Sequence, residues 1–245
     1  MDCRSETSGR PTGDCASGPI CGRAGHIDTV TSLREPSRAA ASVAARGVHK
    51  FDLTIAHGDI HELIRNNLAD RRKEQALAFL PLVKRLQNAG CDCVALTSLG
   101  AHFCVDELAA MSPLPIISGV APLDAHFARR GVRRIGLLGT RVVMRTRLYG
   151  QLERTEALAL DDEIEMLGQT YQDVAVAGAC SPEQRELFLN AGRRMISMGA
   201  DAIVLAGTDL NLAFEGQDPG YPVIDALDVH VALLADLASQ SQTRA

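Results

Sequence analysis

Short apolar runs alternate with longer amphipathic stretches along most of the chain. Runs rich in aliphatic and β-branched residues, such as 93–96 and 203–205, are typical of strands covered on both faces, and such strands lie in parallel sheets. The stretch 72–88 instead places apolar residues at helical spacing and ends before Gly90, a residue suited to the turn that closes a helix. The alternation of strands and helices predicts an α/β fold.

The pattern also gives the expected order of elements. Strands are predicted at 52–56, 92–96, 115–117, 134–138, near 163–166, at 202–205 and at 222–225. Helices are predicted at 31–45, at 72–88, from the turn at 98–102 to residue 111, and at 121–130, 142–153, 182–199 and 229–238. Residues 1–25 show no clear period, so we expect a poorly ordered or degenerate start. We assign 26–117 together with 220–245 to a first α/β half and 118–219 to a second.

Two similar segments, VALTSLGAH at 94–102 and IVLAGTDLNL at 203–212, each place a hydroxyl-bearing turn directly after a predicted strand. In open parallel sheets, ligands collect beyond the carboxyl ends of the strands. A single turn of this kind is more typical of a residue that caps the next helix. Two similar turns from distant parts of the chain favour a shared site in a cleft.

Composition and charge narrow the classes of function. The hydrophobic share is 46% and the aromatic share 4%, without Trp, so the core must be aliphatic. A net charge of −5 and the lack of a basic stripe interleaved with aromatics argue against a nucleic-acid partner. No apolar run reaches the roughly 20 residues that cross a bilayer, and no secretory signal is apparent. We therefore expect a cytoplasmic protein with a small soluble ligand and no membrane partner.

The seven cysteines, at positions 3, 15, 21, 91, 93, 104 and 180, are odd in number and scattered. Such a set indicates reduced thiols rather than a disulfide framework. Cys91 and Cys93 fall in a predicted strand without a second ligand pair, so no metal site is predicted. Cys93 and Cys104 are expected in the core.

Several motifs occur in a characteristic order between residues 47 and 237. They are GVHK at 47–50, DIHE at 59–62, NAGCD at 88–92, RIGLLGTR at 134–141 with Met144 and Tyr149, MGADAIVL at 198–205, and PVID at 222–225 with His230. Together they resemble the aspartate/glutamate racemase superfamily of cofactor-independent racemases. The resemblance implies two Rossmann-like three-layer αβα halves with parallel sheets and a cleft between them, no cofactor, and a homodimer.

In that family two cysteines face each other across the substrate. One thiolate removes the α-proton and the other thiol returns a proton on the opposite face. The resemblance aligns the first thiol with Ser98 and the second with Gly207. A serine hydroxyl is a far weaker acid than a thiol and needs its own base. We therefore expect either altered proton-transfer chemistry on a small amino acid or carboxylic acid, or a non-catalytic homologue that binds such a ligand.

Ser98, His102 and Asp209 are the candidate catalytic residues. Ser98 would bind a carboxylate or donate a proton, His102 would act as the base, and Asp209 would act as an acid/base beside the vacant position 207. The alternatives are helix caps for Ser98 and Asp209 and a structural histidine bonded to backbone for His102. The candidate substrate-binding residues are Thr97, Leu99, Gly100, Thr140, Gly207, Thr208, Asp59 and Asp225.

Overall fold

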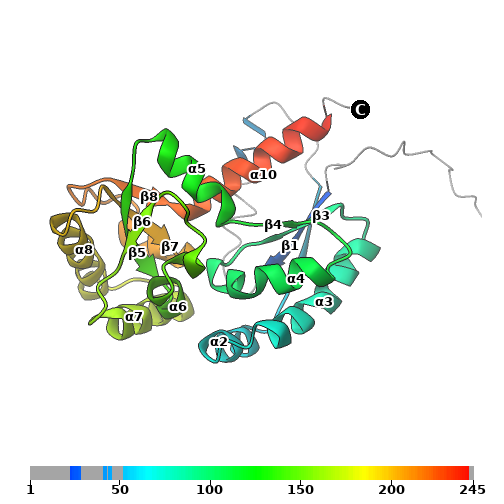
Figure 1. The fold of residues 1–245 in the computed structure, drawn as a ribbon, viewed down its shortest axis with the longest axis horizontal. Helices are drawn as coiled ribbons and strands as arrows, with labels where there is room; N and C mark the ends of the chain where they lie inside the picture. The colour runs from blue at the N-terminus through cyan, green and yellow to red at the C-terminus, as the bar shows by residue number, and fades with distance from the viewer. Residues whose placement is uncertain (1–22, 29–40, 43, 46–51, 243–245) are drawn as a thin grey trace, which may run out of the picture.

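The computed structural model describes residues 23–28, 41–42, 44–45 and 52–242. Two four-stranded sheets, each built from parallel pairs and each accompanied by helices, lie side by side (Figure 1). The predicted α/β fold of two halves with parallel sheets is confirmed. Within the described part of the chain, no helix is long and apolar enough to span a membrane.

The first sheet has the order β2-β1-β3-β4. Its strands are β1 (Arg23–Asp28), β2 (Asp52–His57), β3 (Cys93–Leu96) and β4 (Ile116–Ile117). The accompanying helices are α2 (Ile60–Leu68), α3 (Arg72–Asn88) and α4 (Val105–Met111). Strand β1 lies between β2 and β3, so the expectation of poor order through residue 25 is corrected at 23–25. The rest of that expectation, for 1–22, lies outside the described residues.

The second sheet has the order β6-β5-β7-β8. Its strands are β5 (Arg134–Gly139), β6 (Glu156–Leu158), β7 (Ala202–Ala206) and β8 (Val223–Asp225). The helices of this half are α5 (Ala121–Arg129), α6 (Arg141–Arg145), α7 (Ile164–Ala177), α8 (Pro182–Ser197), α9 (Asn211–Phe214) and α10 (Ala226–Gln242). Most predicted strands and helices coincide with these elements.

Three predicted segments are placed differently, and most of the helix predicted at 31–45 lies outside the described residues. The helix predicted at 142–153 ends at Arg145, because the backbone turns left-handed from Arg147. The strand expected near 163–166 is the start of α7, because Ile164, Leu167 and Val174 are buried on one face at helical spacing. The strand expected at 222–225 pairs with β7 in the second sheet rather than with the first half. Ile203 N–H donates to the Pro222 carbonyl over 2.9 Å, and Ile224 is buried in the core of the second half.

The core of each half is mainly aliphatic, as the composition requires. In the first half Val83 and Leu86 of α3 pack with Val94 of β3, and all three are almost fully buried. In the second half Leu137 and Val204 from neighbouring strands are fully buried. Burying one such side chain stabilises the fold by about 1.5–3 kcal/mol, so the cores hold the strand ends in fixed positions.

Candidate functional site

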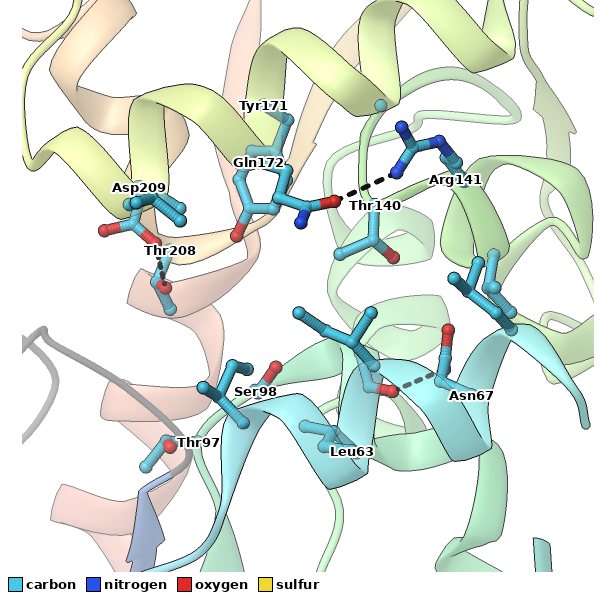
Figure 2. A pocket seen from close by; sticks show the side chains of 18 residues that line it. Leu63, Asn67, Thr97, Ser98, Thr140, Arg141, Tyr171, Gln172, Thr208 and Asp209 are labelled. Carbon is cyan, nitrogen blue, oxygen red and sulfur yellow. Dashed lines mark hydrogen bonds between the residues drawn. The ribbon is translucent and has the colours of Figure 1, made fainter. Parts of the chain in front are cut away.

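An open pocket lies where the carboxyl ends of the two sheets face each other (Figure 2). Its empty volume is ≈ 990 Å³, which includes the solvent at its mouth. The first half contributes one face of α2 and the turn after β3, and the second half contributes α7 and the turns after β5 and β7. The two similar turns, which the sequence predicts to share a cleft, therefore line one pocket.

Six of the sequence-predicted residues line this pocket: Thr97, Ser98, Gly100, Thr140, Thr208 and Asp209. Ser98 precedes the 3-10 helix η1 (Leu99–Cys104), but its side chain makes no capping hydrogen bond to that helix. A Cβ atom at Gly100 would lie 3.3 Å from the Ser98 oxygen and 3.6 Å from Cγ2 of Thr140. The structure therefore gives no support to the capping alternative for Ser98 and places this residue in the lining of the pocket.

The second half supplies Thr140, Thr208 and Asp209 from two strand ends. The Thr140 oxygen accepts from Val143 N–H over 3.3 Å at the start of α6, so its own proton remains for a ligand. The Thr208 hydroxyl lies 3.4 Å from Oδ2 of Asp209, the acceptor. Asp209 lies within η3 (Thr208–Leu210), whose preceding residue, Gly207, has no side chain with which to cap it. A hydroxyl-rich surface thus faces Ser98 across the pocket.

Sequence reasoning missed Tyr171, which reaches the same place from α7. Its hydroxyl group lies beside Thr208 and Asp209, whose side chains and backbone act on its ionisation. Burial is the main cause that raises the pKa of Tyr171, and the negative charge of Asp209 adds to it. The phenol therefore stays protonated. Tyr171 is one of only three tyrosines in the chain, yet the local pattern carries no signal for its role.

Arg141 and Gln172 also line the pocket and were not predicted. The Arg141 guanidinium donates through Nη1 to Oε1 of Gln172 over 3.1 Å, and its Nε lies 3.2 Å from a carboxylate oxygen of Glu165. The side chain of Arg141 is 17% exposed, so this ion pair is only partly screened by solvent. The positive charge beside the pocket is thus already paired with a carboxylate of the protein.

His102 occupies a different position from the one predicted. It is fully buried and does not line the pocket. Its Nε2 accepts from Gly119 N–H over 2.8 Å, so Nδ1 carries the proton and donates to the Ser98 carbonyl over 2.9 Å. Both ring nitrogens are engaged with backbone. We therefore assign His102 the structural alternative, in which it holds the Ser98 turn, rather than the role of a base.

The remaining predicted residues lie beside the pocket or away from it. Leu99 and Gly207 line a smaller adjoining cavity at the start of α10. Asp59 caps α2 by accepting from the backbone N–H groups of His61 and Glu62 at 2.8 and 3.1 Å, and these bonds lower its pKa. Asp225 accepts from Leu227 N–H over 2.9 Å. Neither carboxylate lines the pocket, because each is turned toward the first residues of a helix.

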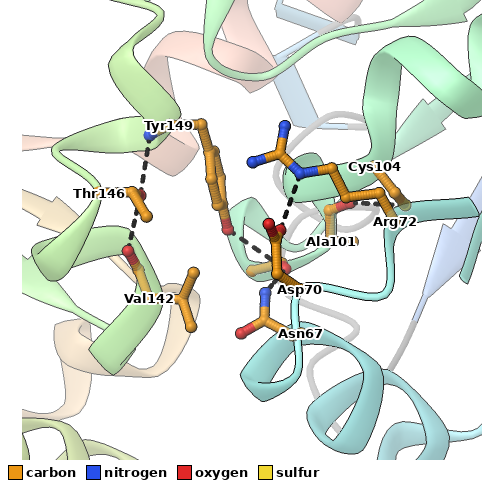
Figure 3. Close-up of polar contacts among 9 residues, drawn as sticks. Asn67, Asp70, Arg72, Ala101, Cys104, Val142, Thr146 and Tyr149 are labelled. Carbon is orange, nitrogen blue, oxygen red and sulfur yellow. Dashed lines mark hydrogen bonds and ion pairs between the residues drawn. The ribbon is translucent and has the colours of Figure 1, made fainter.

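Tyr149 connects the second half to the turn that carries Ser98 (Figure 3). Its hydroxyl group donates to the Leu99 carbonyl over 2.9 Å, and the side-chain amide of Asn67 donates to the Gly100 carbonyl over 2.8 Å. Tyr149 also packs against both hydrophobic cores. It is the last of three successive non-glycine residues with positive φ, of 53°, 56° and 62°. Such backbone conformations are unfavourable for residues with a Cβ atom, so the surrounding packing must stabilise them.

The fold and the sequence can now be compared with known proteins. Residues 29–234 match the family described as Asp/Glu/Hydantoin racemase, which is most of the chain. The chain belongs to the Asp/Glu/hydantoin racemase family. The predicted superfamily is thereby confirmed.

Solved structures of this family share the fold. The chain is similar to a putative Asp/Glu racemase from Yersinia pestis, with 22% identity, a TM-score of 0.77, and coverage of 90% of this chain and 100% of that one. An aspartate racemase homologue from Pyrococcus horikoshii OT3 gives 23% identity, a TM-score of 0.66, and coverage of 89% and 100%. An allantoin racemase from Klebsiella pneumoniae has 17% sequence identity and a TM-score of 0.51, with coverage of 90% of this chain and 89% of that one.

None of the cysteines in the described part of the chain lines the pocket. Cys91, Cys93 and Cys104 are buried and Cys180 is partly buried. Burial raises the pKa of Cys93 to about 11 and that of Cys104 to about 12, so both remain thiols at neutral pH. Neither can supply a thiolate that the racemase family resemblance assigns to the site.

Proposed function

We propose that this protein is a cofactor-independent enzyme that transfers a proton at the carbon next to a carboxylate, in a racemase-like or isomerase-like reaction on a small acid. The observation that carries the proposal is the convergence of Ser98 from one half with Thr140, Thr208 and Asp209 from the other on one pocket. Hydroxyl groups on both sides of the pocket can donate hydrogen bonds to a carboxylate bound between them.

The roles follow from the chemistry of the groups. The hydroxyl groups of Ser98, Thr140 and Thr208 would donate to a substrate carboxylate and to the charge that develops on it when the α-proton leaves. Asp209 lines the pocket beside the Thr208 hydroxyl, and its carboxylate is the base of this proposal. Placing donors where charge develops lowers the barrier without a cofactor.

The walls of the pocket favour a substrate with an apolar substituent. Apolar side chains from α2, α6 and α7 line it, namely Ile60, Leu63, Ile64, Leu68, Val142, Ala175 and Val176. Leu68 and Val176, from α2 and α7, are 57% and 78% exposed, apolar surface that a bound substituent would cover. A second carboxylate on the substrate would find the Arg141 charge already paired with Glu165. The inclusion of hydantoin racemases in the family, and the allantoin racemase among the similar structures, fit substrates beyond aspartate and glutamate.

The test is α-proton exchange in deuterated water, followed by NMR. The separate enantiomers of leucine, phenylalanine, aspartate and glutamate, together with a 5-substituted hydantoin and small dicarboxylates, are incubated with wild-type protein. We expect exchange in an apolar member of the panel and faster exchange there than in aspartate or glutamate. Asp209→Asn should abolish it and Ser98→Ala should lower it, with the far-ultraviolet circular dichroism unchanged. Full activity in both variants would refute the assigned roles.

The second candidate is a binding protein that holds such an acid without turning it over. The absence of any described cysteine from the pocket favours it. A ligand selective for the folded state raises the melting temperature whether or not it reacts. A compound that raises the melting temperature but shows no exchange would therefore decide for the binder. We further propose a homodimer, on the family resemblance alone, which sedimentation equilibrium would test.

A further inference from the structure

Position 207, where the resemblance places the second thiol of the family, is not vacant. A Cβ atom on Gly207 would lie 2.6 Å from Cε2, 2.7 Å from Cζ and 2.8 Å from the hydroxyl oxygen of Tyr171. Real Cβ atoms do not approach other heavy atoms so closely. The backbone of Gly207 is extended, with φ −161°, so its conformation would accept any residue. The tyrosine ring, rather than the backbone, therefore excludes a side chain at 207.

Tyr171 brings a proton-carrying group to the place that the glycine leaves. Figure 2 shows its hydroxyl group on the upper side of the pocket, close to Thr208 and Asp209 and facing the side that holds Ser98. The ring comes from α7, a long helix whose buried face packs into the second core. Its position is therefore fixed by the fold of the second half and not by a flexible loop.

The surroundings of the phenol favour proton transfer to one group. The Asp209 carboxylate beside it favours the protonated phenol, whereas the neighbouring Thr208 hydroxyl and Asp209 backbone N–H favour the ionised form. The Thr208 hydroxyl itself donates to Oδ2 of Asp209 over 3.4 Å, so the phenol oxygen can still accept a proton. A carboxylate that can take up the proton of the phenol thus lies next to it. A group arranged in this way passes a proton along without itself becoming charged.

We infer that Tyr171 and Asp209 together form the acid/base group on the face of the substrate opposite Ser98, an inference that rests on the proposed function. As the α-C–H bond breaks, its proton bonds to the Tyr171 oxygen, and the proton that Tyr171 carried moves to the Asp209 carboxylate. The electron pair of the broken bond stays on the substrate as an enolate of its carboxylate. The reverse transfer, from Asp209 through Tyr171 to carbon, restores the starting state.

The inference is tested with the panel compound that wild-type protein exchanges, using each enantiomer separately. Tyr171→Phe keeps the ring and removes the hydroxyl group. We expect exchange of the faster enantiomer to fall about 100-fold or more, the size of a lost general acid/base. Asp209→Asn, which removes the final proton acceptor, should abolish exchange. The rise in melting temperature caused by that compound should persist in Tyr171→Phe, because the hydroxyl groups that bind the carboxylate remain.

Tyr221→Phe is the matched control. The Tyr221 hydroxyl also donates to a backbone carbonyl, that of Leu189 at 3.0 Å, but Tyr221 does not line the pocket. Its exchange rate should equal that of wild type. Exchange by Tyr171→Phe within tenfold of wild type would overturn the inference and leave the proposed function standing. If wild-type protein exchanges no compound of the panel, both the inference and the proposed function are overturned. If Tyr171→Phe does not fold, Tyr171→Leu, which also removes the hydroxyl group, decides by the same tenfold limit.

Discussion

The turns after β3 and β7 have similar sequences but are built in different ways. The turn at Ser98 is held from behind by the buried ring of His102 and from the side by Tyr149, both through bonds to its backbone carbonyls. The turn at Gly207 is instead overlaid by the ring of Tyr171 on the pocket side. In the proposed site the first turn supplies its hydroxyl group from the strand end, whereas the phenol at the second turn comes from a helix. The two turns therefore differ in which element brings a polar group to the pocket.

Among the variants considered, we expect His102→Ala to destabilise the fold most, because it removes the support of the Ser98 turn. It removes a fully buried side chain and leaves the Gly119 N–H and the Ser98 carbonyl without partners. We expect the free energy of unfolding to fall by about 2–4 kcal/mol in urea denaturation. His61→Ala, at an exposed position of α2, is the control and should change stability little. A loss below the control's would refute the structural role of His102.

Gly207→Cys tests whether the Tyr171 ring excludes a side chain from the second turn. The new side chain meets the Tyr171 ring, so we expect a loss of about 1–3 kcal/mol in unfolding free energy. Ser98→Cys, which restores the first thiol on an existing side chain, should cost little. In a double-mutant cycle with Tyr171→Ala, the cost of Gly207→Cys should shrink by about 1 kcal/mol or more. Additive effects would mean that Tyr171 does not exclude a side chain at 207.

Tyr149→Phe tests the contact between the second half and the Ser98 turn. Loss of the hydrogen bond to the Leu99 carbonyl should lower the unfolding free energy by about 0.5–1.5 kcal/mol. Tyr221→Phe loses a similar bond within the second half and should cost a similar amount. Only Tyr149→Phe should also slow exchange of the substrate, because only its bond supports the Ser98 turn. Equal exchange in the two variants would contradict this.

The smallest effect concerns Asp59, which caps the helix that forms the first-half wall of the pocket. Its pKa is lowered from an ordinary value of 3.8 by the backbone bonds from Glu62 and His61. A lowered pKa in the folded state gives stability that is present above about pH 4 and lost as the pH falls through the folded pKa. The melting temperature of Asp59→Ala should therefore lie below that of wild type at pH 7, and the difference should shrink toward pH 3. A difference independent of pH would contradict the capping role.

The sequence predicted much of the site because strand ends are marked locally. The apolar run 93–96 and the run that ends at Ala206 fix where the chain leaves each sheet, so Ser98, Thr208 and Asp209 could be placed at one edge. The pairing of β8 was wrong, because a short apolar strand carries no mark of which sheet it will join. The helical start of α7 was also missed, since an apolar run of a few residues fits either period.

By itself, the sequence determined the family, the alternation of strands and helices, and the residues at the ends of β3, β5 and β7, because apolar periodicity and motif order are properties of the chain. Only the tertiary structure decided which of those residues meet. Packing of two cores turned His102 away from the pocket and brought Tyr171 of α7 onto Gly207, residues far apart in the chain. Contacts of that kind depend on how helices are seated on the sheets, and no local pattern encodes them.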